Sequence, residues 1–208
     1  LDPEYECPVK KVNLEVSRSL LHEQLKRDQD PIGRIEAAQS LVPKASQTDI
    51  KILSQCLENE TQWGVACRIA KSLGKIGGDL ARDGLLKAVK SREAKIRWGI
   101  VQALGEFLGD EKVARALKKI AGGDPSYRVE AEALASLGRI KAENCRPFLE
   151  SFLDRTSHND IGRSAIFRAL GNLEEEEAWS TLLQGADYGA PRGSRFSAVQ
   201  GLAKLAGR

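Results

Sequence analysis

The sequence predicts an all-α fold, an α-solenoid (superhelix) of about six stacked helix pairs, and two observations support this prediction. A short motif that begins with leucine, most complete as Leu137-Gly138-Arg139-Ile140, recurs every 31 to 33 residues along nearly the whole chain. Between its copies, apolar residues recur at the spacing of an α-helix, and strand signals are lacking. A fixed period of this length indicates a repeat architecture and outweighs any single motif. The leucines that mark the period are Leu41, Leu73, Leu104, Leu137, Leu170 and Leu202.

In chain order, the first twelve residues differ from the rest. They contain two of the seven prolines and no helical period, so we expect an extended lead-in segment over residues 1–12 and a helical pattern from Asn13. A single unit is too short to fold alone, because domains below roughly 40 residues rarely bury enough surface. The units must therefore stack on one another. We expect a repeat domain over residues 13–208, with units at approximately 13–45, 46–77, 78–108, 109–141, 142–174 and 175–208.

Each unit reads as two helices with start and stop signals. Asp30-Pro31 and Asp124-Pro125 each pair an N-capping side chain with a proline that the first helical turn tolerates. The acidic run over residues 174–177 is expected to open the first helix of the last unit, since helix N-termini attract negative charge. Glycines follow the last apolar residue of four second helices, where we expect left-handed C-caps. These glycines are Gly74, Gly105, Gly138 and Gly171.

The first helix of each unit is recognised by apolar residues three or four positions apart. In chain order these are Leu21/Leu25, Ile50/Leu53, Leu85/Val89, Val113/Leu117, Phe148/Phe152 and Trp179/Leu182. The second helices end at the leucines that mark the period. At 100° per residue, their apolar residues fall on one stripe that is expected to face the neighbouring units.

Arginine occupies one position inside that apolar stripe in four of the six units. A row of arginines can bind a ligand, but a buried charge needs a partner, and a residue that recurs across the repeat is more simply explained by a structural role. We therefore expect these arginines to pair with carboxylates between helices, such as Asp30, Asp124 and Asp160. The arginines are Arg34, Arg97, Arg163 and Arg195.

The opposite face of the second helices is expected to line the inner curve of the solenoid, and it is mildly basic. An ordinary solvated face explains this charge, but a basic concave face also suits an acidic or carboxylate-ended partner. The predicted peptide- or partner-binding residues are Arg68, Lys71, Lys95, Arg128 and Arg168. Four aromatic residues fall on the helix flank, where we expect them to seal neighbouring units and not to contact a ligand. They are Trp63, Trp98, Tyr127 and Phe196.

Composition limits the classes of function. A net charge of +3 is too small to predict a nucleic-acid partner, and no apolar run approaches the ~20 residues that span a bilayer. The four cysteines lie far apart without a C-x-x-C pair, so we expect free thiols and a cytoplasmic protein. The chain begins at Leu1 and contains no methionine, which favours a piece of a longer protein.

Catalytic and metal-binding motifs are lacking. His22-Glu23-Gln24-Leu25-Lys26 has lysine where a zinc peptidase helix needs its second histidine. Gly74, Gly77 and Gly78 follow a helix and not a strand, so they do not form a dinucleotide-binding loop. We therefore predict no catalytic residue, no metal ligand and no cofactor in this chain.

Two resemblances can be separated. The pattern Arg34-x-x-Ala37-Ala38-x-x-Leu41 and the Leu-Gly-basic-Ile endings resemble HEAT-like repeats of the phycocyanobilin-lyase type. More specifically, Trp63-Gly64-Val65 and Ser126-Tyr127-x-Val129-Glu130-Ala131-Glu132-Ala133-Leu134, with Asp2-Pro3 in the lead-in, resemble the C-terminal helical domain of aminopeptidase N-like zinc peptidases (gluzincins).

The second resemblance implies a non-catalytic domain that caps the active site of a zinc aminopeptidase and controls the access of peptides. Its partners would be the parent's own catalytic domain and the peptide substrate, with zinc in that catalytic domain. The family's H-E-x-x-H and G-x-M-E-N motifs are absent from this chain, so no catalytic residue transfers to it. The alternative is a stand-alone HEAT-repeat scaffold or adaptor for protein–protein interaction.

Overall fold

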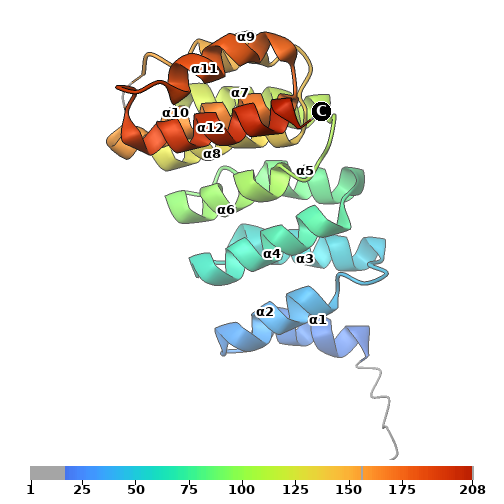
Figure 1. Ribbon diagram of the computed structural model, residues 1–208. Coiled ribbons are helices and arrows are strands. Elements are labelled where there is room, and N and C mark those ends of the chain that lie inside the picture. Colours follow the sequence, from blue (N-terminus) through green and yellow to red (C-terminus); the bar gives the residue numbers. More distant parts are fainter. Residues whose placement is uncertain (1–16, 156, 208) are drawn as a thin grey trace, which may run out of the picture.

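The computed structural model describes residues 17–155 and 157–207, and every regular element in these ranges is helical. The predicted lead-in segment and the expected helix start at Asn13 lie outside the described residues. One helix pair falls within each predicted unit (Figure 1). The pairs are α1 (Arg18–Arg27) with α2 (Pro31–Ser40), α3 (Gln47–Asn59) with α4 (Trp63–Ile76), α5 (Gly78–Ala88) with α6 (Ala94–Leu104), α7 (Glu111–Gly123) with α8 (Tyr127–Arg139), α9 (Arg146–Glu150) with α10 (Ile161–Leu173), and α11 (Trp179–Ala186) with α12 (Arg192–Ala206). Short 3-10 turns, η1 (His158–Asp160) and η2 (Glu176–Ala178), precede α10 and α11.

The helices form two layers, and the even-numbered layer is the inner one. At every step along the stack, the even-numbered helices contact one another more extensively than the odd-numbered helices do. A layer whose helices lie closer together occupies the shorter arc of a curved stack. The predicted apolar stripe of the second helices is buried in the interior units; Ile69, Ile100 and Ile166 are fully buried. This arrangement is an α-solenoid with one continuous core.

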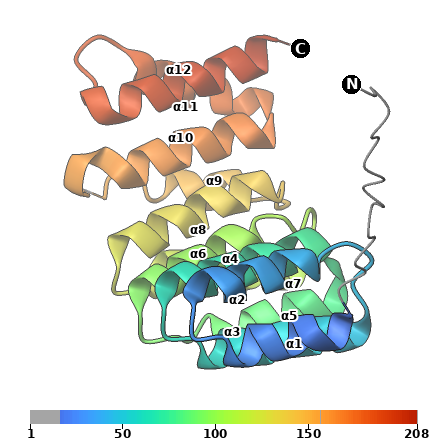
Figure 2. The same cartoon turned by 90° about the horizontal axis from the view of Figure 1, so that it is seen from below.

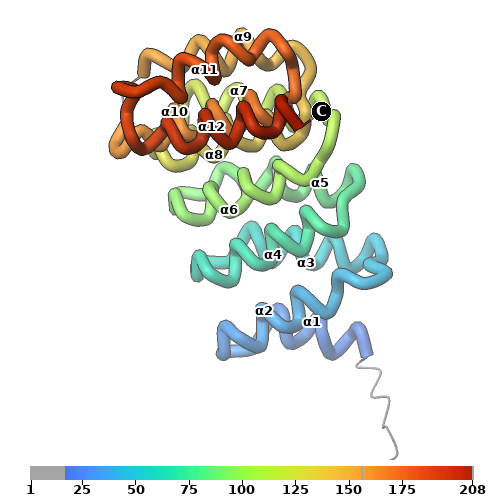
Figure 3. The backbone as a smooth tube through the Cα atoms, in the orientation of Figure 1, coloured from blue at the N-terminus to red at the C-terminus, as the bar shows by residue number. Residues whose placement is uncertain are grey.

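The stack changes direction between the third and fourth units. In Figure 1, α2, α4 and α6 rise one above the other, whereas α8, α10 and α12 lie in one tier and overlap. After a 90° turn, the first three overlap and the last three are spread across the view (Figure 2). The tube drawing shows the same turn (Figure 3). The even-numbered helices line the inside of this turn, so the curvature is concentrated at the junction of α6 and α8.

None of the four motif glycines forms the predicted left-handed cap; Gly105 does follow α6, but with a φ of −65°. Gly74, Gly138 and Gly171 lie inside α4, α8 and α10, and the positive-φ glycines are others, such as Gly77 at the end of α4. The motif glycines lie where the next unit comes closest. A Cβ on Gly138 would lie 2.3 Å from Ala169 Cα, and one on Gly171 would lie 2.6 Å from Gly201 Cα. These glycines are therefore required by close packing between helices and not by a left-handed cap.

The two predicted helix starts have different outcomes. Asp30 caps α2 as expected, because its side chain accepts a hydrogen bond from the Ile32 backbone N–H at 2.9 Å. Asp124 does not cap α8, which has Ser126 at its N-cap position. Its carboxylate instead accepts from the Ser126 N–H and from Arg97. The acidic run opens the helical segment of the last unit in part, because Glu176 and Glu177 lie in η2, which leads directly into α11.

Candidate functional site

A cavity of about 450 Å³ lies at the inside of the turn in the stack. We call it the inner cavity, and its lining comes from α4, α6, α8 and α10. Helices packed side by side are about 8–10 Å apart, so α4 and α10 would not share a cavity in a straight stack. The turn between the third and fourth units therefore creates this site. The residues central to it are Trp63, Lys95, Trp98, Arg128, Ile161 and Arg168.

Three of the five predicted binding residues line this cavity. Lys95 and Arg128 occupy the first turn of α6 and of α8, and Arg168 reaches it from the middle of α10. The shared position of Lys95 and Arg128 in the repeat places both on the same face of consecutive helices. The sequence analysis thus correctly grouped these side chains on one surface, while their role in binding stays a prediction.

The inner cavity keeps an excess of positive charge. Within residues 17–155 and 157–207, none of Lys95, Arg128 and Arg168 forms an ion pair with a carboxylate. One acidic residue, Glu132, lines the cavity, but its Oε1 accepts from Arg139 Nη2 at 2.6 Å. Since Arg139 already offsets the Glu132 charge, the three cations can pair with an anionic ligand.

Aromatic and aliphatic side chains supply the rest of the lining. Trp63 is 51% exposed, and Lys95 Nζ lies 5.1 Å from the centre of its ring, which is within the range of a cation–π contact. Trp98 is half-buried, and Ala131 and Ile161 complete the apolar part. Both tryptophans therefore line the inner cavity, and the expectation that they seal neighbouring units and do not contact a ligand stays a prediction. The sequence carried a signal for Trp98, because Lys95 and Trp98 are three residues apart in α6 and so share one side of that helix.

The other two predicted residues lie in a separate depression of about 290 Å³. We call it the basic cleft; Arg68 and Lys71 of α4 line it together with Lys75, which the sequence analysis did not select. Gln39 and Pro43 from the end of the first unit form its other wall. The structure therefore divides the predicted site into two places on the inner layer, with the larger one at the turn.

The arginines of the apolar stripe are structural in three of the four cases. Arg97 binds Asp124 through two hydrogen bonds of 2.7 and 2.8 Å, and Arg163 lies 3.7 Å from Asp160. Arg34 does not pair with Asp30; it binds Glu60 of the next unit at 3.1 Å. Burial opposes ionisation of Asp124, but hydrogen bonds from Arg97 and Ser126 lower its pKa below the ordinary 3.8. The pairs of Arg34 and Arg97 connect successive units, whereas Arg163 pairs within its own unit.

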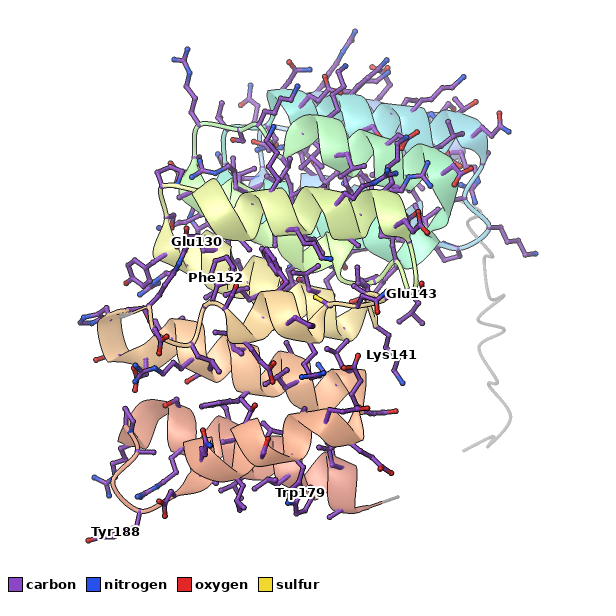
Figure 4. All side chains as sticks on the ribbon, turned by 90° about the horizontal axis from the view of Figure 1, so that it is seen from above. Glu130, Lys141, Glu143, Phe152, Trp179 and Tyr188 are labelled. Atoms are coloured by element: carbon purple, nitrogen blue, oxygen red, sulfur yellow. The ribbon has the colours of Figure 1, made fainter. Side chains whose placement is uncertain are left out.

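Arg195 is the exception, and the fourth unit has a different residue at this position. Arg195 lies over the Tyr188 ring, 6.0 Å from its centre. In the fourth unit the equivalent residue is Glu130, near Phe152 in Figure 4. Burial raises the pKa of Glu130, and the nearby charge of Arg155 partly offsets that effect.

Catalytic geometry is not found in the part of the chain that the structure describes. No group of three or more His, Cys, Asp or Glu side chains there could hold a metal ion. Ser46, His22 and Asp49 do come together, but Ser46 Oγ donates to Asp49 at 2.7 Å and makes no bond to the His22 ring. A serine nucleophile needs that bond to its base. The described cysteines are free thiols, and burial raises the pKa of Cys145 to about 11.

The repeated helix pairs are matched by a known family. A family profile described as HEAT repeats matches residues 18–105, 50–135 and 116–203, which together cover nearly the whole described chain. The chain belongs to the HEAT-repeat family. No curated protein sequence matches it significantly. None of the helices in the described ranges has the length and apolar character needed to cross a membrane.

Solved structures resemble this HEAT-repeat protein in fold at low sequence identity. The complex of CpcE and CpcF of phycocyanin lyase from Nostoc sp. PCC7120 has 20% identity and a TM-score of 0.57, over 96% of this chain and 92% of that one. Human deoxyhypusine hydroxylase has 17% identity and a TM-score of 0.50, over 92% and 96%. A designed armadillo repeat protein in complex with the peptide (KR)4 has 16% identity and a TM-score of 0.52, over 91% and 99%. At these identities the likeness shows the fold alone.

Proposed function

We propose that this HEAT-repeat protein is a non-catalytic scaffold whose inner layer binds an acidic, extended segment of a partner protein. The observation that supports this is the inner cavity, where Lys95, Arg128 and Arg168 have no carboxylate partner among the described residues and surround Trp63 and Trp98. Apolar walls with cations around them suit an apolar side chain flanked by carboxylates. The basic cleft would receive a further acidic part of the same segment.

A repeat protein of similar fold provides a useful comparison. The designed armadillo protein noted above is in complex with (KR)4, a basic peptide. A basic peptide needs anionic side chains to bind to, whereas the inner cavity of the present chain is lined by cations. We therefore expect the opposite charge in its ligand.

Charge reversal at the cavity tests the proposal. The probe is a synthetic peptide with phenylalanine flanked by glutamates on both sides, and binding is followed by tryptophan fluorescence in a Trp179→Phe background. Combining Arg128→Glu with Arg168→Glu should weaken binding at least about tenfold, since hydrogen bonds to charged groups each contribute roughly 1.5–3 kcal/mol. The matched control is Arg115→Glu, at an exposed residue of α7. The proposal is refuted if the double variant and the Arg115→Glu control bind the peptide with equal affinity. It is also refuted if a peptide flanked by lysines binds the unchanged protein as well as the peptide flanked by glutamates.

A narrower hypothesis is that the chain is the C-terminal domain of a zinc aminopeptidase, as the motifs around Trp63 and Ser126 indicated. The acidic group at the inner cavity would then be the carboxylate of a peptide substrate, and the partner would be the parent's zinc-containing catalytic domain. None of the matches described above is a peptidase, and this hypothesis rests on the motif resemblance. Reading the gene upstream of Leu1 decides it: H-E-x-x-H with a downstream glutamate supports a peptidase parent, and a frame without these ligands refutes one.

A further inference from the structure

The outer layer opens between α5 and α7, on the outside of the turn in the stack. One step earlier, α3 and α5 pack closely, and a Cβ on Gly84 would lie 2.2 Å from Ser54 Oγ. In contrast, α5 and α7 are joined mainly near the start of α7. Arg82 Nη1 lies 3.0 Å from Asp110 Oδ2, and Lys112 Nζ lies 3.0 Å from Asp83 Oδ1. Towards their C-terminal ends the helices diverge.

A groove of about 640 Å³ occupies the space between the diverging ends. We call it the outer groove. Leu86 and Val89 of the α5 side and Ala116 and Ile120 of α7 form apolar walls, and all four are partly exposed. They occupy the side of each helix that would contact its neighbour if α5 and α7 packed along their whole length. The turn of the stack therefore leaves two apolar helix faces without a partner helix between them.

The rim of the outer groove is basic. Lys90 and Lys119 border it without an ion pair to any described residue. Lys112 is paired with Asp83, which also binds Arg82. The acidic residue in its lining, Asp124, is already bonded to Arg97. A ligand for this groove therefore has to be apolar on one side and negatively charged at its edges.

We propose that the outer groove binds a short amphipathic helix of a partner protein, with acidic residues flanking its apolar face. Two helices that diverge leave a space shaped for a third, and side chains at i, i+3 and i+4 of that helix can fill the apolar walls. Beyond the ion pairs, the open part of α7 extends from Ala116 to Gly123, roughly 10 Å at 1.5 Å per residue. About two turns of the partner helix therefore make the contact. This site is independent of the inner cavity and of the function proposed for it.

The test uses a fluorescent synthetic peptide of about 14 residues, with leucines on one helical face and glutamates elsewhere. Anisotropy measures its affinity, and circular dichroism measures helix formation on binding. Ile120→Glu and Leu86→Glu should each lower affinity at least about tenfold, as should the double variant Lys90→Glu with Lys119→Glu. Leu108→Glu is the matched control, because Leu108 is 73% exposed and lies outside the groove. Thermal unfolding of each variant shows that it is folded.

The remaining outcomes also decide the matter. The variant with Arg128→Glu and Arg168→Glu should bind this peptide with unchanged affinity, which separates this proposal from the one for the inner cavity. Replacing the glutamates of the peptide by lysines should abolish binding. No binding, an equal loss in Leu108→Glu, or loss only in the inner-cavity variant would overturn the proposal. Displacement of the peptide by duplex RNA would assign the lysines to a nucleic acid instead.

Discussion

Replacing Asp49 by asparagine is expected to destabilise the first two units by about 1.5–3 kcal/mol, the typical contribution of a hydrogen bond to a charged group, because Asp49 is buried while Arg18 is 40% exposed. The Asp49 side chain is fully buried and accepts from Arg18 Nη1 at 2.5 Å, from His22 Nε2 at 2.6 Å and from Ser46. Burial opposes its ionisation, but the bonds from Ser46 and His22 and the charge of Arg18 lower its pKa. The neutral amide would leave Arg18 and His22 of α1 without their anion.

The loss should be local, because each unit of a repeat array contacts only its neighbours. Hydrogen exchange should therefore accelerate in α1, α2 and α3 and stay unchanged in α10 and α12. Asp154→Asn is the control, since Asp154 is exposed, and surface substitutions of this kind usually change stability by less than about 0.5 kcal/mol. Uniform acceleration over all six units, or the same small effect in both variants, would contradict this account.

Gly138→Ala is the second substitution with a large expected effect, and it should cost about 3 kcal/mol. Its new Cβ would lie 2.3 Å from Ala169 Cα and 2.6 Å from Ala169 O, so the backbone of α10 would have to move away from α8. Overpacking of this kind typically costs 1–3 kcal/mol, and here the obstacle is main chain and not a flexible side chain.

The same substitution at Gly122 should have the opposite sign. Gly122 lies in α7, and no atom lies within 4 Å of a Cβ built on it. Alanine there should stabilise the helix by about 0.5–1 kcal/mol. Urea denaturation of both variants measures the two free energies of unfolding. If Gly138→Ala also stabilises the protein, α8 and α10 do not pack as closely at Gly138 as described above.

The fold was predictable because it depends on information that is local and repeated. The leucine period and the apolar stripe follow from helix geometry alone, and the same residues are buried in the interior units. The motif glycines were misassigned for a physical reason. A glycine in the last turn of a helix can serve a left-handed cap or a close contact, and only the position of the neighbouring helix distinguishes the two. Asp124 was misassigned similarly, since Arg97 comes from another unit.

The candidate site was predictable only in part. Helical periodicity placed Lys95, Arg128 and Arg168 on one face, because that face depends on each helix by itself. The turn between the third and fourth units depends on how whole units pack, and it brings Trp63 of α4 into the same cavity as Arg168 of α10. Sequence periodicity carries no signal for that angle, so the division of the five predicted residues between two places was not foreseen.

Bending at the turn of the stack would make the inner cavity and the outer groove mechanically antagonistic. They lie on opposite sides of one junction, so bending that narrows one widens the other, as in the two faces of a hinge. A ligand that closes the inner cavity would then weaken binding in the outer groove without touching it, and thermodynamic linkage requires an equal reverse effect. Each peptide is titrated in the presence of the other. If the junction bends, both affinities should fall by the same factor; if it is rigid, neither affinity should change. If the junction bends, a change in the curvature of this solenoid would let the binding of one partner lower the affinity for the other.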